Sequence, residues 1–590
     1  MLDPAPAVFR KSKIGPGNEA RLVIDKLQHP EHSSSFYVKR LKTMGINVKR
    51  DAVGKVFSLW RVDQYTSSFV SNLHRFESIL LEIDHSKTEP TQEVVRLADA
   101  NFLQMWQGMQ KYPFGTEAPG LFVLWAYIEE LGILPLLESM GLSKPPKQAK
   151  YSWTDFLLFE IARHFFGIST ASTACESEIP ELSYFAHLFR TPCNDTLLSG
   201  LSRITQKQSA ELRQWLVQQL ASLGLATGRR LAFDFHQIDQ DVILSMLRQF
   251  GKGPSPKKKY CYTGFRPHIA WDIDQGTLLV AEFRKGSARG PTTIRRFIGD
   301  HILPSFRGLF DTVYIDSEYT GKDVWNFILD KENGMGADLV ACLKQNAFVR
   351  KARDELLHQN AAREDFWKYY DENHVYGIDT FALRWQYIHP HSEKTTVMEL
   401  HCAVKKHVKT GKLRCFGSSK LHVNASDIFS DYSHRWVIEN GIKDLIHSYF
   451  IDKCPGETPH AIDVHFLIIT ICRALYRMIE RDAGDLVKNA DGTTKTLARM
   501  RNTLFRQGTG NLCIKEGKLV ISLDRAYSSK RTHMLREWFD TVSAKHKAGL
   551  TLIGGLGLRF RTHPAHGPEF RNAGRKQPLS VMRNIEENVQ

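Results

Sequence analysis

The sequence predicts an α/β fold for the middle of the chain, and two features of its pattern support this. The segment RRLAFDFHQID at 229–239 alternates apolar and polar residues, which is typical of a half-buried strand. Strand-like and helix-like segments then follow one another up to residue 345, whereas the part before 229 has mostly helical spacing. A chain of 590 residues is long enough for about three or four domains.

Each element of the α/β region has a local signal in the sequence. Alternation or short apolar runs mark the strands, and Pro291 suits the first turn of a helix. The predicted elements are strands at 229–239, 266–274, 277–286 and 337–345, a helix at 290–303, and a strand ending at Asp316 followed by a helix within 310–329.

The segment 346–425 differs, because short β-rich runs replace the alternation. We interpret it as an inserted, largely antiparallel subdomain. Helical spacing returns at 430–450 and 460–482. We expect a helical N-terminal region at 1–145 with a candidate helix-turn-helix at 34–62, a helical DNA-binding or accessory domain at 146–228, a catalytic domain at 229–345 and 426–482, an insertion at 346–425, a C-terminal region with a β-hairpin at 483–560, and a disordered tail at 561–590.

The charge balance favours a polyanionic partner. The chain has 79 basic and 64 acidic side chains, a formal net charge of +15. Such an excess repels itself unless a polyanion neutralises it, so nucleic acid is the leading candidate, and a merely basic soluble protein is the alternative. The nine cysteines include no C-x-x-C pair, which excludes the usual zinc and disulfide patterns. The most apolar stretch, 465–479, is interrupted by Arg473. We therefore expect a soluble, non-exported protein without membrane contact.

Three acidic residues stand out by their position. Asp234 lies in the first strand, Asp316 ends a later strand, and Glu439 lies on a helix after the β-rich segment. Carboxylates from two strands and a helix are hard oxygen ligands for Mg²⁺, and a pair of such ions can activate water for phosphodiester cleavage. Three acids among 64 are weak evidence when taken alone.

The order of Asp234, Asp316 and Glu439 on these elements resembles the DDE transposases of bacterial insertion sequences. The similar group is the cut-and-paste group, which carries a Tyr-Arg-Glu-Lys signature and a β-rich insertion before the catalytic Glu. The segment YSHRWVIENGIKDLIHSYF matches it at Tyr432, Arg435 and Glu439, whereas Ile446 stands where the Lys is usual. FRPHIAWDIDQGTLLVAEFRKGSARG, DSEYTG and FRQGTGNLCIKEGKLVISLD also match, so the resemblance covers roughly 150–525.

The resemblance implies a ribonuclease-H-like catalytic domain in which Asp234, Asp316 and Glu439 are catalytic and hold Mg²⁺, with two ions and with Mn²⁺ able to substitute. It implies cleavage of double-stranded DNA at transposon ends and strand transfer into target DNA by a protein that dimerises on DNA, in the bacterial cytoplasm with the nucleoid. No small-molecule cofactor is implied. Tyr432 and Arg435 would contact phosphate, and Lys443 or His447 would replace the missing Lys.

Two alternatives stay open at this point. One is a nuclease of the same fold that cuts DNA without joining it. The other is a catalytically impaired relative that binds DNA as a regulator, which the Ile446 departure favours. Glu318 is a candidate accessory ligand, whereas Asp444 should point away from the site because it lies five residues beyond Glu439 on the helix.

Basic runs supply further candidate DNA contacts. The segment 248–268 has six Lys or Arg, no acid and interleaved aromatics, and its candidate phosphate ligands are Lys257, Lys258, Lys259 and Arg266. The segment 401–415 is also basic and acid-free, and a charged hairpin edge that prevents aggregation is the alternative. Trp385 and Trp436 could stack on a base, but we expect both to pack in the core.

Overall fold

A computed structural model gives the fold and confirms the predicted α/β class. The structure describes residues 22, 33–43, 48, 53, 114–116, 118–145, 151–170, 173–174, 179–186, 191–239, 252–254, 261–390, 392–422, 424–454, 458–506, 510–515, 518–523, 529–545 and 557–562. Most of the candidate helix-turn-helix at 34–62 therefore lies outside the described residues, as do Lys257, Lys258 and Lys259. The predicted tail at 561–590 also lies outside them, apart from residues 561 and 562, which belong to a strand.

A ten-stranded mixed sheet forms the centre of the molecule. Its first half matches the predicted strands: β6 pairs antiparallel with β2, β7 pairs antiparallel with β6, and β8 and β9 run parallel to β2 on its other side. The strands of this half are β2 (Arg230–Phe235), β6 (His268–Asp272), β7 (Thr277–Glu282), β8 (Thr312–Ile315) and β9 (Asp338–Leu343).

The β-rich segment extends this same sheet. Strand β14 pairs antiparallel with β9, and β13, β11 and β10 follow in order, with β12 paired to the first half of β13. The strands are β10 (Trp367–Asp371), β11 (His374–Gly377), β12 (Phe381–Ile388), β13 (Thr395–His407) and β14 (Leu413–Ser418). The antiparallel pairing within the segment agrees with expectation, but helix α17 (Ala347–Gln359) was not predicted.

Helices cover both faces of the sheet. On one face Phe297 of α14 packs against Phe233, and on the other Gly441 of α19 lies against Trp271. A Cβ added at Gly441 would lie 2.5 Å from the Trp271 ring, so glycine permits this close approach. The covering helices are α12 (Gln206–Ser222), α14 (Gly290–His301), α15 (Leu303–Phe306), α16 (Lys322–Leu329), α17, α18 (Ala425–Ser433), α19 (Trp436–Tyr449) and α20 (Pro459–Asp482).

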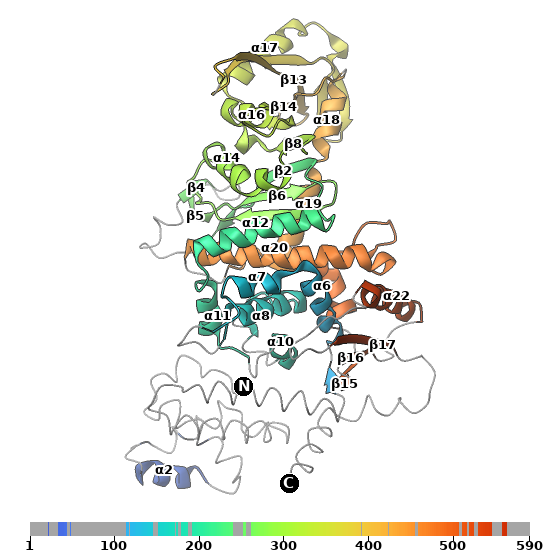
Figure 1. Cartoon of the computed structure of the whole chain (residues 1–590). Coiled ribbons are helices and arrows are strands. Elements are labelled where there is room, and N and C mark those ends of the chain that lie inside the picture. The colour runs from blue at the N-terminus through green and yellow to red at the C-terminus, as the bar shows by residue number, and fades with distance from the viewer. Residues whose placement is uncertain are drawn as a thin grey trace.

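Helix α20 separates the sheet from a second, helical layer (Figure 1). It is buried along most of its length and contacts β7 on one side and α6 and α8 on the other. The helical layer contains α6 (Leu124–Leu131), α7 (Ile133–Ser139), α8 (Trp153–Phe166), α10 (Pro180–Phe185) and α11 (Asn194–Leu201), with α21 (Leu497–Met500) and α22 (Ser529–Lys545) beside it. Helix α2 (Ser34–Thr43) precedes it in the chain.

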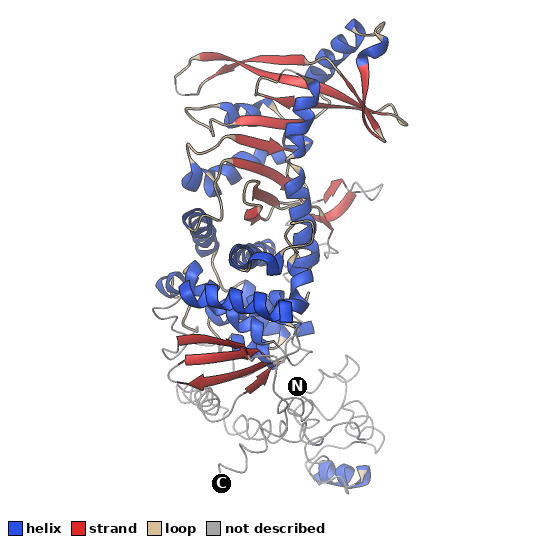
Figure 2. Ribbon diagram, turned by 90° about the vertical axis from the view of Figure 1, so that its right-hand side faces the viewer, coloured by secondary structure: helices blue, strands red, loops and turns tan. Residues whose placement is uncertain are grey.

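Two smaller sheets complete the described structure (Figure 2). Strands β15 and β16 form an antiparallel pair at the position of the predicted hairpin. The strands are β1 (Phe114–Thr116), β15 (Gly510–Lys515), β16 (Lys518–Leu523) and β17 (Gly557–Thr562) in one sheet, and β3 (Ile238–Asp239), β4 (Lys252–Pro254) and β5 (Cys261–Phe265) in the other. Within the described ranges no single helix could cross a membrane by length and composition; one pair bent by 63°, Gly120–Leu131 with Ile133–Ser139, passes that test together.

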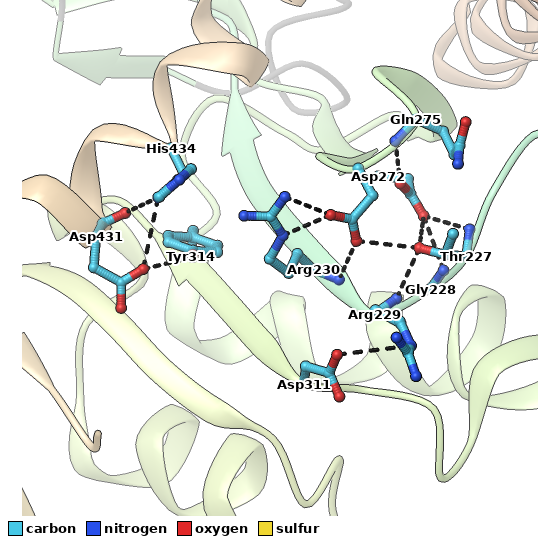
Figure 3. Close-up of polar contacts among 11 residues, drawn as sticks. Thr227, Gly228, Arg229, Arg230, Asp272, Gln275, Asp311, Tyr314, Asp431 and His434 are labelled. Atoms are coloured by element: carbon cyan, nitrogen blue, oxygen red, sulfur yellow. Dashed lines mark hydrogen bonds and ion pairs between the residues drawn. The ribbon is translucent and has the colours of Figure 1, made fainter. Parts of the chain in front are cut away.

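Polar contacts fix the edge of the sheet where β2 and β8 begin (Figure 3). The buried Asp272 carboxylate accepts hydrogen bonds at 2.8 Å from the backbone N–H groups of Thr227 and Gly228. The Tyr314 hydroxyl donates to Asp431 at 2.7 Å, which ties β8 to the end of α18. Because Tyr432 follows Asp431, this contact also positions the start of the predicted signature.

Candidate active site

The parallel pairing of β2 and β8 brings the first two predicted carboxylates to one edge of the sheet. Phe233 pairs with Ile315, and Asp234 and Asp316 are the next residues on the two strands. Neighbouring strands lie about 4.8 Å apart, and equivalent positions project to the same face. Asp234 is buried, whereas Asp316 is partly exposed just after β8 ends. The register of the two strands thus brings together residues that are far apart in the sequence.

Arg435 joins Asp234 to the third predicted carboxylate. It lies at the junction of α18 and α19, where its Nη1 donates to the Asp234 carboxylate at 2.5 Å and its Nη2 donates to Glu439. Arg435 and Glu439 are one helical turn apart, so their side chains share a face of α19. The structure therefore places Asp234, Arg435 and Glu439 in one cluster next to Asp316, as the sequence predicts.

The cluster carries more negative than positive charge. Burial raises the pKa of Asp234, the Arg435 guanidinium opposes this, and the charge of Asp316 adds to it, with a resulting pKa of about 6. Burial would lower the pKa of Arg435, but Tyr432 and the three carboxylates raise it above its ordinary value. One guanidinium thus faces three carboxyl groups, and ionisation of Asp234 is less favourable here than in water.

These residues fit a divalent cation. Carboxylate oxygens are the ligands that Mg²⁺ prefers, and the uncompensated negative charge of this cluster is what such an ion would neutralise. Glu439 keeps 42% of its side chain exposed, so the cluster is accessible from solvent. The Nε of Arg435 is buried and has no hydrogen-bond partner within the described part of the chain.

Tyr432 lies beside Arg435, and Lys443 follows Glu439 on α19. The Tyr432 ring packs against Phe416 of β14 at 4.9 Å between centroids, and the Arg435 guanidinium carbon lies 5.4 Å from that ring. Lys443 is exposed one turn after Glu439, with its Nζ 5.7 Å from the Trp436 ring. Tyr432 is therefore positioned beside the carboxylates, whereas the Lys443 amine donates to Asn440 at 3.5 Å.

Two expectations for α19 and its neighbours are corrected or sharpened by burial. Trp436 is 60% exposed, so the prediction that it packs in the core is wrong, whereas Trp385 is buried and confirmed there. Ile446, at the position of the usual Lys, packs against the main core. His447 is exposed, and Asp444 bonds to Ser448, away from Asp234 and Arg435. A lysine at 446 would thus have to leave a half-buried position to reach DNA.

Arg266 and Glu318 form an ion cluster of their own behind the site. The two oxygens of Glu318 accept from Arg266 and Arg284, each at 2.8 Å. The Arg266 guanidinium carbon also lies 4.2 Å above the Phe235 ring. Arg266 was predicted as a phosphate ligand and Glu318 as an accessory metal ligand; in the structure Arg266 and Arg284 share the Glu318 carboxylate.

A buried hydrogen-bond chain supports Asp234 and was not predicted from the sequence. The Tyr319 hydroxyl donates to the backbone oxygen of Asp234 at 3.1 Å and is bonded to His268 at 2.9 Å. His268 also contacts the Thr293 hydroxyl at 2.8 Å, and burial holds its pKa well below the ordinary value. In the sequence this hydrogen-bond chain is marked by Tyr319, three residues after Asp316. That position does not reveal a partner on another strand.

A second group of potential metal ligands lies far from this site in the helical layer. Glu160, His164 and His465 place ligand atoms within 4.8 Å of one another, all buried. Arg163 already occupies this group: it contacts both oxygens of Glu160, at 3.0 and 2.5 Å, and lies 3.0 Å from His164 Nε2. The guanidinium stands where a cation would bind, so these residues fit a metal ion poorly.

Comparison with known proteins agrees with the carboxylate site. Residues 240–475 match the family described as the transposase DDE domain. The match begins just after Asp234 and includes Asp316, Arg435 and Glu439. Residues 240–475 are thus similar to the transposase DDE domain, and the carboxylate site agrees with that similarity.

The other comparisons add little to this assignment. The cryo-EM structure of the piggyBac transposase synaptic complex with hairpin DNA resembles the chain with a TM-score of 0.35 and 11% identity, over 80% of this chain and 91% of that chain. A likeness of this degree carries no weight for function. No curated protein matches the chain.

Proposed function

We propose that the protein is a DNA transposase of the bacterial insertion-sequence type, with a ribonuclease-H-like catalytic domain. It cleaves double-stranded DNA at the transposon ends and transfers the released 3′-hydroxyl ends into target DNA. The observation that carries this proposal is the joining of Asp234 and Glu439 through Arg435 beside Asp316. The transposase DDE domain match supports it.

The carboxylates of this chain would hold the metal ions. Asp234, Asp316 and Glu439 would bind a pair of Mg²⁺ ions between their three carboxyl groups, and Mn²⁺ could substitute. Bound ions supply a Lewis acid and lower the pKa of water. The excess negative charge of the cluster favours their binding, and it would otherwise repel a phosphodiester.

The neighbouring residues would orient the DNA. Arg435 would contact a phosphate oxygen, and Tyr432 lies beside it. Lys443 is exposed on the same helix and would contact the DNA backbone in place of a lysine at 446. Pairing of two transposon ends requires at least a dimer on DNA. The bacterial cytoplasm with its nucleoid is the compartment where such a reaction would occur.

The test is a cleavage and joining assay with purified protein on DNA that carries the inverted repeats flanking its gene. With Mg²⁺ we expect cut ends and strand-transfer product, and a chelator should abolish both. Asp234→Asn, Asp316→Asn and Glu439→Gln should each lower the rate at least about 10³-fold, equal to about 4 kcal/mol, with DNA binding retained.

Asp311→Asn is the matched control, since Asp311 precedes β8 at the opposite edge of the sheet and its side chain is 59% exposed. We expect it to cut at the wild-type rate. Cleavage without joined product would indicate a nuclease, and binding without cleavage would indicate a regulator. Cleavage unaffected by the three substitutions would refute the assigned site.

A further inference from the structure

The edge of the sheet that carries Asp316 continues into the β-rich segment. Strand β9 is parallel to β8, so Lys344, which follows β9, lies at the same edge as Asp316. The backbone N–H of Lys344 donates to the Thr320 hydroxyl at 3.1 Å, which fixes it beside the loop that follows Asp316. Lys344 is therefore one strand away from the carboxylate.

The register places three further cations along this edge. Cys415 of β14 pairs with Leu343, so Arg414 lies beside Lys344. Strand β13 runs antiparallel to β14, and the turn between them, at 408–412, projects beyond the same edge. We call Lys344, Lys409, Lys412 and Arg414 the basic rim. Neighbouring strands lie about 4.8 Å apart, so the residues of the basic rim lie between about 5 and about 14 Å from β8, the strand that precedes Asp316.

The charge of the basic rim is uncompensated. All four side chains are exposed, and no ion pair holds any of them within the described ranges. Asp371, at the end of β10, is itself engaged by His374 at 2.8 Å and by Lys405 at 3.8 Å. A row of free cations at regular spacing is the electrostatic pattern that a polyanion complements.

The opposite edge of the same sheet is built differently. There cations alternate with acids, as in the pairs Arg384–Glu399 at 3.0 Å and Lys420–Asp431 at 3.1 Å. Both edges share the same strands, so the difference does not follow from the fold. Figure 1 shows β13, β14, α17 and α18 together at one end of the molecule, beyond β8. At the edge that holds the candidate active site, the cations of the basic rim thus have no acid paired with them within the described residues, whereas cations at the opposite edge lie among Asp311, Asp338 and Glu399.

We propose that the basic rim binds the backbone of duplex DNA that passes the carboxylate site, through its phosphates and without recognition of sequence. The inference rests on the proposed function, because the orientation of the DNA is taken from the site at Asp316. Lysine and arginine contacts to phosphate release condensed counterions, so they contribute affinity that falls steeply with salt.

The experiment compares two double variants of the full chain by fluorescence anisotropy on a duplex of ~30 base pairs. The rim variant is Lys409→Gln/Lys412→Gln, which lies in a turn and leaves all strand pairing intact. The control is Lys331→Gln/Lys394→Gln, two exposed lysines near the opposite edge. Each variant loses the same charge, so a general loss of positive field affects both alike.

We expect the rim variant to bind about tenfold more weakly near physiological salt, with a slope of log affinity against log salt that is less negative by about 2. Adding Lys344→Gln should change the slope by about 1 more. The fall should be equal on a duplex with a transposon end and on an unrelated duplex. Equal affinity and slope for the rim and control variants would overturn the inference, and so would a fall confined to the transposon end.

Failure of this inference can be told from failure of the proposed function. If the rim variant binds like the control while cleavage still depends on Asp234, the basic rim alone is refuted. If the rim variant binds weakly but cleavage does not depend on Asp234, the proposed site is refuted and the DNA-binding surface stands.

Discussion

The protein contains two clusters of carboxylate and arginine that look alike in composition and differ in charge balance. In the carboxylate site, Arg435 serves Asp234 and Glu439, with Asp316 beside them. In the helical layer, Arg163 donates hydrogen bonds to one carboxylate, that of Glu160, next to His164 and His465. We call the first cluster the open cluster, because it has more negative than positive charge and one exposed residue. We call the second the closed cluster, because its charges balance and its residues are buried.

This difference shows that ligand types at short distance do not define a metal site by themselves. Burial lowers the pKa of His465 to about 3, and Arg163 adds to this effect, so the imidazole stays neutral. An ion entering that group would have to displace a guanidinium whose contacts to Glu160 are made without water. In the carboxylate site an ion would instead relieve the repulsion that raises the pKa of Asp234.

The largest expected effect on stability comes from the closed cluster. Glu160→Gln removes the only negative charge there and leaves Arg163 buried without a counter-charge, which should cost about 3–5 kcal/mol. Urea unfolding measures the loss. Glu211→Gln on the exposed side of α12 is the control, and its change should stay within about 0.5 kcal/mol.

Metal content provides the second half of this comparison. Glu160→Gln should leave the metal content of the purified protein unchanged, because Arg163 and not an ion balances Glu160. One tightly held metal ion per chain that disappears in the Glu160→Gln protein would contradict this account of the closed cluster.

A pH titration tests the open cluster. In the metal-free folded protein Asp234 has a pKa of about 6, above its ordinary value of 3.8, so the folded state keeps a proton that the unfolded chain loses. Stability from this group is therefore full below about pH 4 and falls as the pH rises to about 6. The side chain at position 234 of the Asp234→Asn variant cannot ionise. The free energy of unfolding of this variant, relative to that of the wild type, should therefore increase by about 3 kcal/mol between these two pH values.

The measurement is urea unfolding with a chelator between about pH 4 and pH 7.5. The gain of Asp234→Asn over the wild type should level off above about pH 6. Asp311→Asn, which removes an exposed carboxylate, should show a small and constant difference. A difference for Asp234→Asn that is constant or shrinks with rising pH would contradict the assigned charge balance.

Much of the first half of the sheet could be predicted from the sequence because it depends on local pattern, whereas the three carboxylates were selected by the resemblance to a transposase signature. Alternation marks β2 and a short apolar run marks β8, and these place Asp234 and Asp316 at strand ends. The pairing of β14 with β9 could not be predicted, because register between distant strands leaves no local trace. The exposure of Trp436 was missed for the same reason: it depends on which side of α19 meets the sheet.

The engagement of Arg266 by Glu318 was hidden as well. The two residues are 52 positions apart, and each has the residue type and context of a functional side chain. Only the fold shows that they satisfy each other. Sequence thus identified the kinds of residue that the site uses, and the structure decided which of them remain available to a ligand.

The smallest expected effect on stability concerns how α19 is seated. Gly441→Ala would place a Cβ 2.5 Å from the Trp271 ring, and such overpacking should cost about 1–3 kcal/mol. Because Glu439 lies two residues away on the same helix, the shift of α19 should lower the cleavage rate more than the folded fraction alone accounts for. Cleavage rate and urea unfolding are measured on the same preparation.

Gly299→Ala separates this seating effect from the general effect of alanine in a helix. Gly299 lies in α14 on the other face of the sheet, and an added Cβ there meets nothing within 4 Å. Alanine has the higher helix propensity, so this control should be neutral or more stable by up to about 1 kcal/mol, with an unchanged cleavage rate. If Gly441→Ala behaved in the same way, contact with Trp271 could not be what fixes Glu439. The open cluster would then depend on Arg435 alone for its geometry, as the closed cluster depends on Arg163.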